Sequence, residues 1–237
     1  MRVKEEFNKY AKNYSKYSHI QNKIASILVE NIDSFRVDNI VDIGSGDGMI
    51  YKKLIEKDIK FKNFYAIDFA PKMLKLHPKE SRVKVICADF NKGKIFNLLK
   101  DKGIDLAISS SALQWAKDLK FTFKEISKVS NSGLFFLFTS NTFKSLHNLV
   151  GVKSPIFSEY EIVDAFINSY ESLKIQKFSF KLEFRDTLDM LRYIKKSGVG
   201  GNLRLNYSDI KYIINNYPND YLEFETILLK GKSRCQS

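Results

Sequence analysis

Residues 41–48 read VDIGSGDG and connect an apolar, β-branched run to residues 49–55, which have the composition of a helix. The segment therefore predicts a strand, a tight glycine turn and a helix N-terminus. Glycine adopts positive φ and has no Cβ, so a ligand can approach the backbone of such a turn closely. The first N–H groups of the helix would face that ligand. The glycines alternate as G-x-G-x-G, which differs from the G-x-G-x-x-G spacing of a dinucleotide-binding turn.

Acidic residues flank this turn on both sides. Asp42 lies two positions before the first glycine, Gly44, and Asp68 ends a second apolar run at residues 63–68. Asp68 follows Gly48 by 20 residues, the separation at which a nucleoside-binding βαβ unit places a carboxylate on the ribose hydroxyls. An ordinary tight turn in an α/β sheet is the alternative, because a glycine turn taken alone has low specificity.

The strand, the glycine turn and the two acidic residues together resemble the class I S-adenosylmethionine-dependent methyltransferases. The resemblance implies an α/β, Rossmann-like fold in which a seven-stranded sheet carries helices on both faces. It implies a single domain over residues 1–237, with an N-terminal helical cap at residues 1–36 and lid segments at residues 141–172 and 186–220. It also implies S-adenosylmethionine as the cofactor and S-adenosylhomocysteine as the product, without a metal ion.

The cofactor-binding positions are carried over from the family's motifs residue by residue. Asp68 would bind the ribose, Asp89 would accept a hydrogen bond from the adenine amino group, and Phe90 would pack on the adenine ring. For Asp89 the alternative role is a helix cap, and for Met73 it is core packing. The full set of cofactor-binding residues implied by the resemblance is Asp42, Gly44, Ser45, Gly46, Gly48, Asp68, Phe69, Met73, Asp89, Phe90 and Ser110.

The methyl acceptor is expected next to the loop that follows the fourth strand, residues 104–110. This loop reads SALQW and would lie at the carboxyl ends of the strands, where open α/β sheets bind their ligands. Gln114 and Trp115 are therefore predicted to contact the substrate, with core packing as the alternative for Trp115. The loop lacks the N/D-P-P-Y motif of amino-group methylases, which argues against methylation of DNA adenine or protein glutamine.

Several further segments resemble one subfamily, the malonyl-acyl-carrier-protein O-methyltransferases of early biotin synthesis. They are residues 7–14, 111–119, 139–147 and 191–201. The resemblance implies methylation of the free carboxylate of a malonyl thioester that an acidic acyl carrier protein holds. Members of this subfamily carry an arginine that could grip this carboxylate, and the short linker at residues 147–157 contains no obvious counterpart of it.

Two basic residues are predicted to bind the substrate in its place. They are Lys153, a point charge of lower geometric specificity than arginine, and Arg192. A carboxylate acceptor is ionised at neutral pH, so transfer of an activated sulfonium methyl group needs alignment and desolvation more than a general base. A phenol or enol acceptor would need a base, for which Tyr14 and His147 are the predicted catalytic residues. A solvated loop histidine is the alternative reading of His147.

The composition, 44% apolar and 28% charged over 237 residues, is that of a globular protein. The two cysteines, Cys87 and Cys235, indicate a reducing cytoplasm rather than a disulfide framework. Neither the cysteines nor the three histidines have metal-ligand spacing. No apolar run is long enough to span a membrane, and the N-terminus has no signal peptide. We therefore expect a cytoplasmic protein without a membrane partner.

The formal net charge of +12 is consistent with an acidic protein partner, with nucleic acid, or with a lysine-rich composition that has no functional role. The lack of a dense arginine block and of an interleaved basic-aromatic stretch argues against nucleic acid. An acidic acyl carrier protein is the expected partner, with Lys144, Lys195 and Lys196 among its docking residues. The alternatives are a quinone or phenol methyltransferase, an RNA methyltransferase, and a non-catalytic module that binds S-adenosylmethionine.

Overall fold

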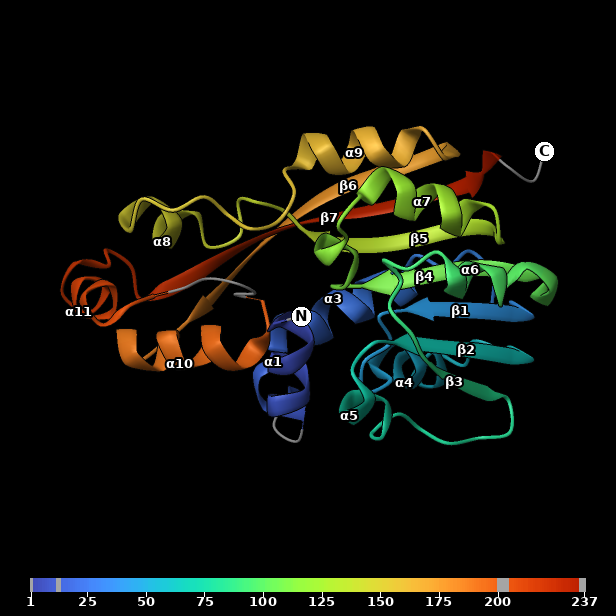
Figure 1. Cartoon of the computed structure of the whole chain (residues 1–237), viewed down its shortest axis with the longest axis horizontal. Coiled ribbons are helices and arrows are strands. Elements are labelled where there is room, and N and C mark those ends of the chain that lie inside the picture. Colours follow the sequence, from blue (N-terminus) through green and yellow to red (C-terminus); the bar gives the residue numbers. More distant parts are fainter. Residues whose placement is uncertain (1, 12–13, 200–204, 235–237) are drawn as a thin grey trace.

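The structure is a computed structural model that describes residues 2–11, 14–199 and 205–234. Within these residues the chain forms a seven-stranded sheet of order β3-β2-β1-β4-β5-β7-β6 (Figure 1). β7 is antiparallel to both of its neighbours, and the other adjacent strands are parallel. The strands are β1 (Asn39–Ile43), β2 (Asn63–Asp68), β3 (Val83–Cys87), β4 (Ile104–Ser110), β5 (Ser130–Phe138), β6 (Tyr170–Glu183) and β7 (Tyr221–Ser233). The predicted seven-stranded α/β fold is confirmed.

Helices pack against both faces of this sheet. The α-helices are α1 (Arg2–Tyr10), α2 (Tyr14–Tyr17), α3 (His19–Glu30), α4 (Met49–Glu56), α5 (Pro71–Leu74), α6 (Lys94–Asn97), α7 (Leu119–Ser127), α8 (Lys144–Leu149), α9 (Glu159–Ile167), α10 (Thr187–Ser197) and α11 (Tyr207–Asn216). Short 3-10 helices are η2 (Lys100–Lys102) and η3 (Leu113–Trp115). Residues 200–204 of the predicted second lid, and Cys235, lie outside the described residues.

Successive residues of the central strands enter two separate cores. Ile40 and Ile108 pack with side chains of α3 and α4, whereas Val41 and Phe135 pack with side chains of α7 and α9. This alternation follows from the period of two residues along a strand. Because helices cover both faces, the central strands are apolar on both sides. All side chains of residues 134–138 are accordingly buried.

The last two strands extend beyond the end of β5. Phe138 at the end of β5 pairs with Thr226, whereas β7 continues to pair with β6 as far as Tyr221. We call this extension, residues 179–183 of β6 and residues 221–225 of β7, the arm. In Figure 1 the helices α8, α10 and α11 lie around the arm, on the left, away from most of the sheet. They occupy the two segments that the sequence predicted as lids.

The N-terminal helices contact both the sheet and the end of α10. α3 packs against β4 and β5. Gln21 Nε2 donates a hydrogen bond to the carbonyl oxygen of Ser197 at 3.0 Å, and both residues are buried. Lys196 Nζ donates to the hydroxyl of Tyr17 at 2.9 Å and also lies over its ring. The N-terminal cap therefore fixes the C-terminal end of the helix that runs beneath the arm.

Candidate active site

The glycine turn follows β1 at the carboxyl edge of the parallel strands. Gly44, Gly46 and Gly48 all have positive φ, of 80°, 56° and 82°, a region that side-chain-bearing residues rarely enter. The N–H groups of Gly44 and Ser45 donate to the carbonyl oxygen of Ile67 at 2.8 and 2.9 Å, which joins the turn to β2. Gly48 is the N-cap of α4. The expected strand, turn and helix N-terminus are thus all present.

Asp68 ties this turn to the loop that follows β2. Its Oδ2 accepts the N–H of Gly46 at 3.0 Å, and its Oδ1 accepts the N–H of Ala70 at 2.7 Å. Burial raises the pKa of Asp68 to about 6, although the backbone N–H groups of Ala70, Gly46 and Phe69 and the charge of Lys4 favour the carboxylate. The side chain is only 8% exposed. A carboxylate has about four lone-pair sites, so these two bonds leave acceptor capacity for a ligand.

Five buried polar side chains near the same edge have at least one atom without a hydrogen-bond partner among the described residues. They are Asp42, Ser45, Ser110, Ser111 and Gln114. Burial of Asp42 is the least favourable of the five for folding, because neither of its carboxylate oxygens accepts a hydrogen bond. Burial, and then the nearby charge of Asp68, raise the pKa of Asp42 well above its ordinary value. Buried polar groups are normally hydrogen-bonded, so this group of orphaned atoms indicates a site for a polar ligand.

The loop after β4 packs directly on the first glycine of the turn. A Cβ placed on Gly44 would lie 2.2 Å from the Cβ of Ala112, so only glycine fits beneath this loop. Ser111 adopts a positive φ of 57°, and its carbonyl oxygen accepts a hydrogen bond from Gln114 Nε2 at 2.8 Å. The role of Ala112 was not predicted, because nothing in the glycine spacing indicates which side chain fills the space above Gly44.

Comparisons with known proteins agree with this geometry. A family model described as a methyltransferase domain matches residues 41–138. Malonyl-[acyl-carrier protein] O-methyltransferase 2 of Coxiella burnetii is 31% identical over 206 residues, covering 83% of this chain and 80% of that protein. Its counterpart from Priestia megaterium is 27% identical, covering 92% and 90%. The YcgJ protein of Bacillus subtilis has a TM-score of 0.63 at 15% identity, covering 90% and 98%. This chain belongs to the class I S-adenosylmethionine-dependent methyltransferases.

The residues of the methyltransferase site fit S-adenosylmethionine. The cofactor has a cationic sulfonium and a cationic ammonium group, and a nearby positive charge would favour the ionised form of the buried, unbonded Asp42. The space at Gly46 is open, since a Cβ there would meet only Met73 Cε, at 3.4 Å. When bound, the cofactor supplies an electrophilic methyl group. Asp42, Asp68 and the turn could bind and orient it.

The predicted adenine-side residues lie at the ends of β2 and β3. Phe69 packs edge-on against Phe7 of α1, with 6.5 Å between ring centroids. Met73 is buried in a small cluster with them. Asp89 Oδ1 accepts the backbone N–H of Asn91 at 3.0 Å, which closes a turn; the N-cap of α6 is Gly93, so the alternative role of Asp89 as a helix cap is wrong. Phe90 is buried in the core beneath α6 and α7, and its contact with adenine stays a prediction.

One of the two predicted catalytic residues, His147, lies away from this edge. His147 lies on α8, which Figure 1 shows beside the arm and apart from the ends of β1 and β4. Its side chain is buried and its Nδ1 has no partner among the described residues, so the reading as a solvated loop histidine is wrong. Burial lowers the pKa of His147, against the opposing effect of Glu223. Tyr14 begins α2, and its side chain lies outside the described part of the structure.

The predicted substrate-binding residues are also distributed over several elements. Gln114 is buried and Trp115 half-buried in η3, directly after β4. Lys153 is exposed in the loop after α8. Arg192 is exposed on α10, and its guanidinium pairs with Asp189 at 2.8 Å. Gln114 and Trp115 therefore adjoin the glycine turn, whereas Lys153 and Arg192 belong to the helices around the arm.

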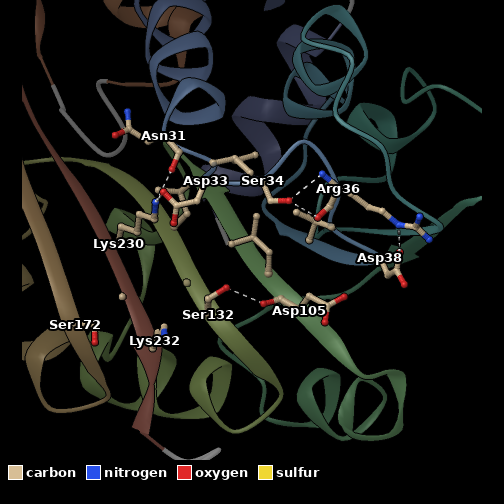
Figure 2. Close-up of a pocket in the computed structure, with 16 residues that line it drawn as sticks. Asn31, Asp33, Ser34, Arg36, Asp38, Asp105, Ser132, Ser172, Lys230 and Lys232 are labelled. Atoms are coloured by element: carbon tan, nitrogen blue, oxygen red, sulfur yellow. Dashed lines mark hydrogen bonds and ion pairs between the residues drawn. The ribbon is translucent and has the colours of Figure 1, made fainter.

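A separate cavity of about 870 Å³ lies at the opposite edge of the sheet, where the parallel strands begin (Figure 2). Its polar groups already bond to one another. Lys230 pairs with Asp33, Arg36 pairs with Asp38 at 3.2 Å, and Ser132 donates to the carbonyl oxygen of Asp105 at 2.7 Å. None of the orphaned buried atoms belongs to its lining. The cavity therefore lacks the unmet bonding capacity that marks the glycine-turn edge.

Two further classes of site were searched for in residues 2–11, 14–199 and 205–234. No cluster of three or more histidine, cysteine, aspartate or glutamate residues there could hold a metal ion. No helix in that part of the chain is long and apolar enough to cross a membrane. Cys87 is a free, exposed thiol at the end of β3.

Substitution of two glycines in the turn should separate cofactor binding from folding. Gly46→Ala has space in the free protein, so its stability should fall only by the positive-φ cost of about 1–2 kcal/mol, while affinity for S-adenosylhomocysteine should fall about tenfold or more. Gly44→Ala would overlap Ala112 and should lower the melting temperature further. Calorimetric titration and thermal denaturation measure the two effects. Unchanged affinity in a folded Gly46→Ala protein would show that the ligand does not approach this glycine.

Affinity for S-adenosylhomocysteine should depend on pH with a defined sign. The pKa of Asp68 is raised to about 6 in the free protein, and donated ribose hydroxyls would favour the ionised form. Binding should therefore release a proton, so affinity should increase as pH rises through about 6. Asp42 has a raised pKa as well and contributes in the same direction. Calorimetric titrations of the wild type and of Asp68→Asn over a range of pH test this. The Asp68→Asn protein should bind S-adenosylhomocysteine weakly, and its affinity should change less with pH. A wild-type affinity that does not change with pH would contradict the prediction.

Proposed function

We propose that this methyltransferase transfers a methyl group from S-adenosylmethionine to the free carboxylate of a malonyl thioester on an acyl carrier protein, a step of biotin synthesis. The observation that carries the proposal is the match to two proteins named for this activity, over 83% and 92% of the chain. These matches extend well beyond the methyltransferase domain at residues 41–138. They therefore include parts of the N-terminal helices and the arm, which differ more between methyltransferases than the cofactor turn does.

The polar groups near the glycine turn support an acceptor that is already ionised. The five orphaned side chains named there are one carboxylate, three hydroxyls and one amide, and the orphaned imidazole beside the turn belongs to His77, which packs against Tyr51, Phe64 and Gly48. An ionised carboxylate needs no proton removal, so alignment with the sulfonium and exclusion of water would account for catalysis. A phenol acceptor would need a base such as His147, which lies on α8 beside the arm. The carboxylate acceptor is therefore favoured over the phenol.

Mass spectrometry tests the activity itself. Protein, S-adenosylmethionine and malonyl-acyl carrier protein are mixed, and the carrier is examined for one added methyl group. Acetyl-acyl carrier protein, which has no free carboxylate on the acyl group, is the matched control and should stay unmodified. Methylation of a phenolic or RNA substrate, with none on the malonyl carrier, would replace the proposal with one of the alternatives.

A docking surface for the carrier is proposed on the helices around the arm. Acyl carrier proteins are acidic, and electrostatic complementarity would raise the rate of association. Lys144 and Lys195 are exposed on α8 and α10, and no ion pair involving either is present in the described structure. Lys196, in contrast, is engaged by Tyr17. The proposed docking residues are therefore Lys144 and Lys195, and Lys196 is assigned to the contact with the N-terminal cap.

Charge reversal at these lysines should affect the carrier-bound substrate selectively. The double variant Lys144→Glu, Lys195→Glu should raise KM for malonyl-acyl carrier protein several-fold, with a smaller effect at high salt, and should change KM for malonyl-coenzyme A much less. Lys100→Glu, Lys102→Glu carries the same charge change on η2, which precedes β4 at the opposite edge of the sheet, and should leave both values unaltered. Equal increases for both substrates would indicate that Lys144 and Lys195 only stabilise their helices.

A further inference from the structure

His77 is a buried histidine to which the sequence assigned no role. It follows α5 on the way to β3 and is 2% exposed. Its ring packs against Tyr51 of α4 and Phe64 of β2, at 5.7 and 5.9 Å between centroids. Nδ1 lies 3.0 Å from the carbonyl oxygen of Pro78, whereas Nε2 is buried without a hydrogen-bond partner among the described residues.

The rings of His77 and Pro78 fill the space where Gly48 would carry a side chain. A Cβ on Gly48 would lie 2.6 Å from Pro78 Cδ, 2.9 Å from His77 Cδ2 and 3.0 Å from His77 Nε2. Gly48 is both the last glycine of the cofactor turn and the N-cap of α4, with a φ of 82°. The two rings therefore pack against the residue that sets where the turn ends and where the helix N–H groups begin.

The neutral form of His77 suits this position. With Nδ1–H donating to Pro78, the lone pair of Nε2 remains beside Gly48 at the positive end of α4. Burial lowers the pKa of His77, and of the two nearby charges Lys52 lowers it while Asp47 raises it. A neutral imidazole can thus contact the helix N-terminus without placing a second positive charge there.

We propose that His77 and Pro78 are positioning residues for the cofactor-binding turn, acting through Gly48 rather than by contact with the ligand. The proposal rests on the function proposed above only in taking the glycine turn as the cofactor site. Ordinary core packing against Tyr51 and Phe64 is the competing account of His77. The two accounts differ because a packing residue affects stability alone, whereas a positioning residue also affects the affinity of a cofactor that it does not touch.

The chain offers a matched control in Phe61. Its ring packs against the same two partners, at 5.6 Å from Tyr51 and 5.7 Å from Phe64, it is also buried, and it is not among the atoms nearest Gly48. His77→Leu and Phe61→Leu should both lower the melting temperature. Only His77→Leu should weaken S-adenosylhomocysteine binding about tenfold, raising KM for S-adenosylmethionine while KM for the methyl acceptor stays unchanged.

A rescue experiment tests the contact with Gly48 itself. Gly48→Ala should weaken cofactor binding strongly in wild type, and by a smaller factor when His77→Ala and Pro78→Ala have first removed the two rings. Three outcomes would each overturn the proposal. The His77 and Phe61 variants could lose cofactor affinity equally, a folded His77→Leu protein could keep its affinity unchanged, or the substitutions in the rescue series could have additive effects on affinity. If His77→Leu does not fold, the milder His77→Gln takes its place and the same outcomes decide. Absence of binding to the wild-type protein would instead count against the cofactor site as a whole.

Discussion

The bonds from Gly46 and Ala70 to the carboxylate of Asp68 are the constraint on which the rest of the site depends. They connect the turn after β1 to the loop after β2, so two strand ends become one rigid ligand-binding edge. Because the carboxylate is almost completely buried, these charge-assisted bonds are stronger than their exposed equivalents. Burial nevertheless dominates the balance and raises the pKa of Asp68 to about 6. The free protein therefore contains a carboxylate whose ionisation is sensitive to what binds beside it.

Asp42 lies behind this connection and is less well satisfied. Its two oxygens have no partner in the described structure, and an unpaired buried charge is strongly unfavourable. A folded chain tolerates such a group where stability is supplied elsewhere, and here the two apolar cores on either side of the sheet supply it. These unbonded carboxylate oxygens lie at the edge of the sheet that carries the glycine turn, which favours binding of a cationic ligand there.

A different feature, the extension of β6 and β7 beyond β5, organises the helices around the arm. α8, α10 and α11 gather around this arm, and α10 is fixed at its C-terminal end by Gln21 and Tyr17 of the N-terminal helices. Phe7 of α1 lies near both sides, because its ring contacts Phe69 beside the cofactor turn and fills the space where Gly198 would carry a Cβ. The N-terminal cap is therefore a physical link between the cofactor edge and the helices around the arm.

Local sequence was sufficient for the features that short-range chemistry controls. Alternating glycines predicted the turn at residues 44–48, and the local S-x-x-E pattern is the signal of the capping box that α9 has at Ser158 and Glu161. A similar N-x-x-D pattern at Asn206 and Asp209 caps α11. That capping box is likewise a local signal, since its two residues are three positions apart. α8 has no such local signal, because the side chain that accepts the N–H of Ser145 in its first turn is that of Glu223, which is distant in sequence.

The sequence by itself therefore determined the fold class, the glycine turn and the acidic residues at the ends of β1 and β2. These features depend on local properties of the chain: the two-residue period of a strand, the positive φ of glycine, and the position of a residue at the end of an apolar run. Only the tertiary structure decided that Ala112 covers Gly44, that His77 and Pro78 pack on Gly48, and that Lys196 bonds to Tyr17. It also decided that His147 is buried on α8 beside the arm. Each of these contacts joins residues far apart in the chain, and it exists because packing of the helices on the sheet brings them together.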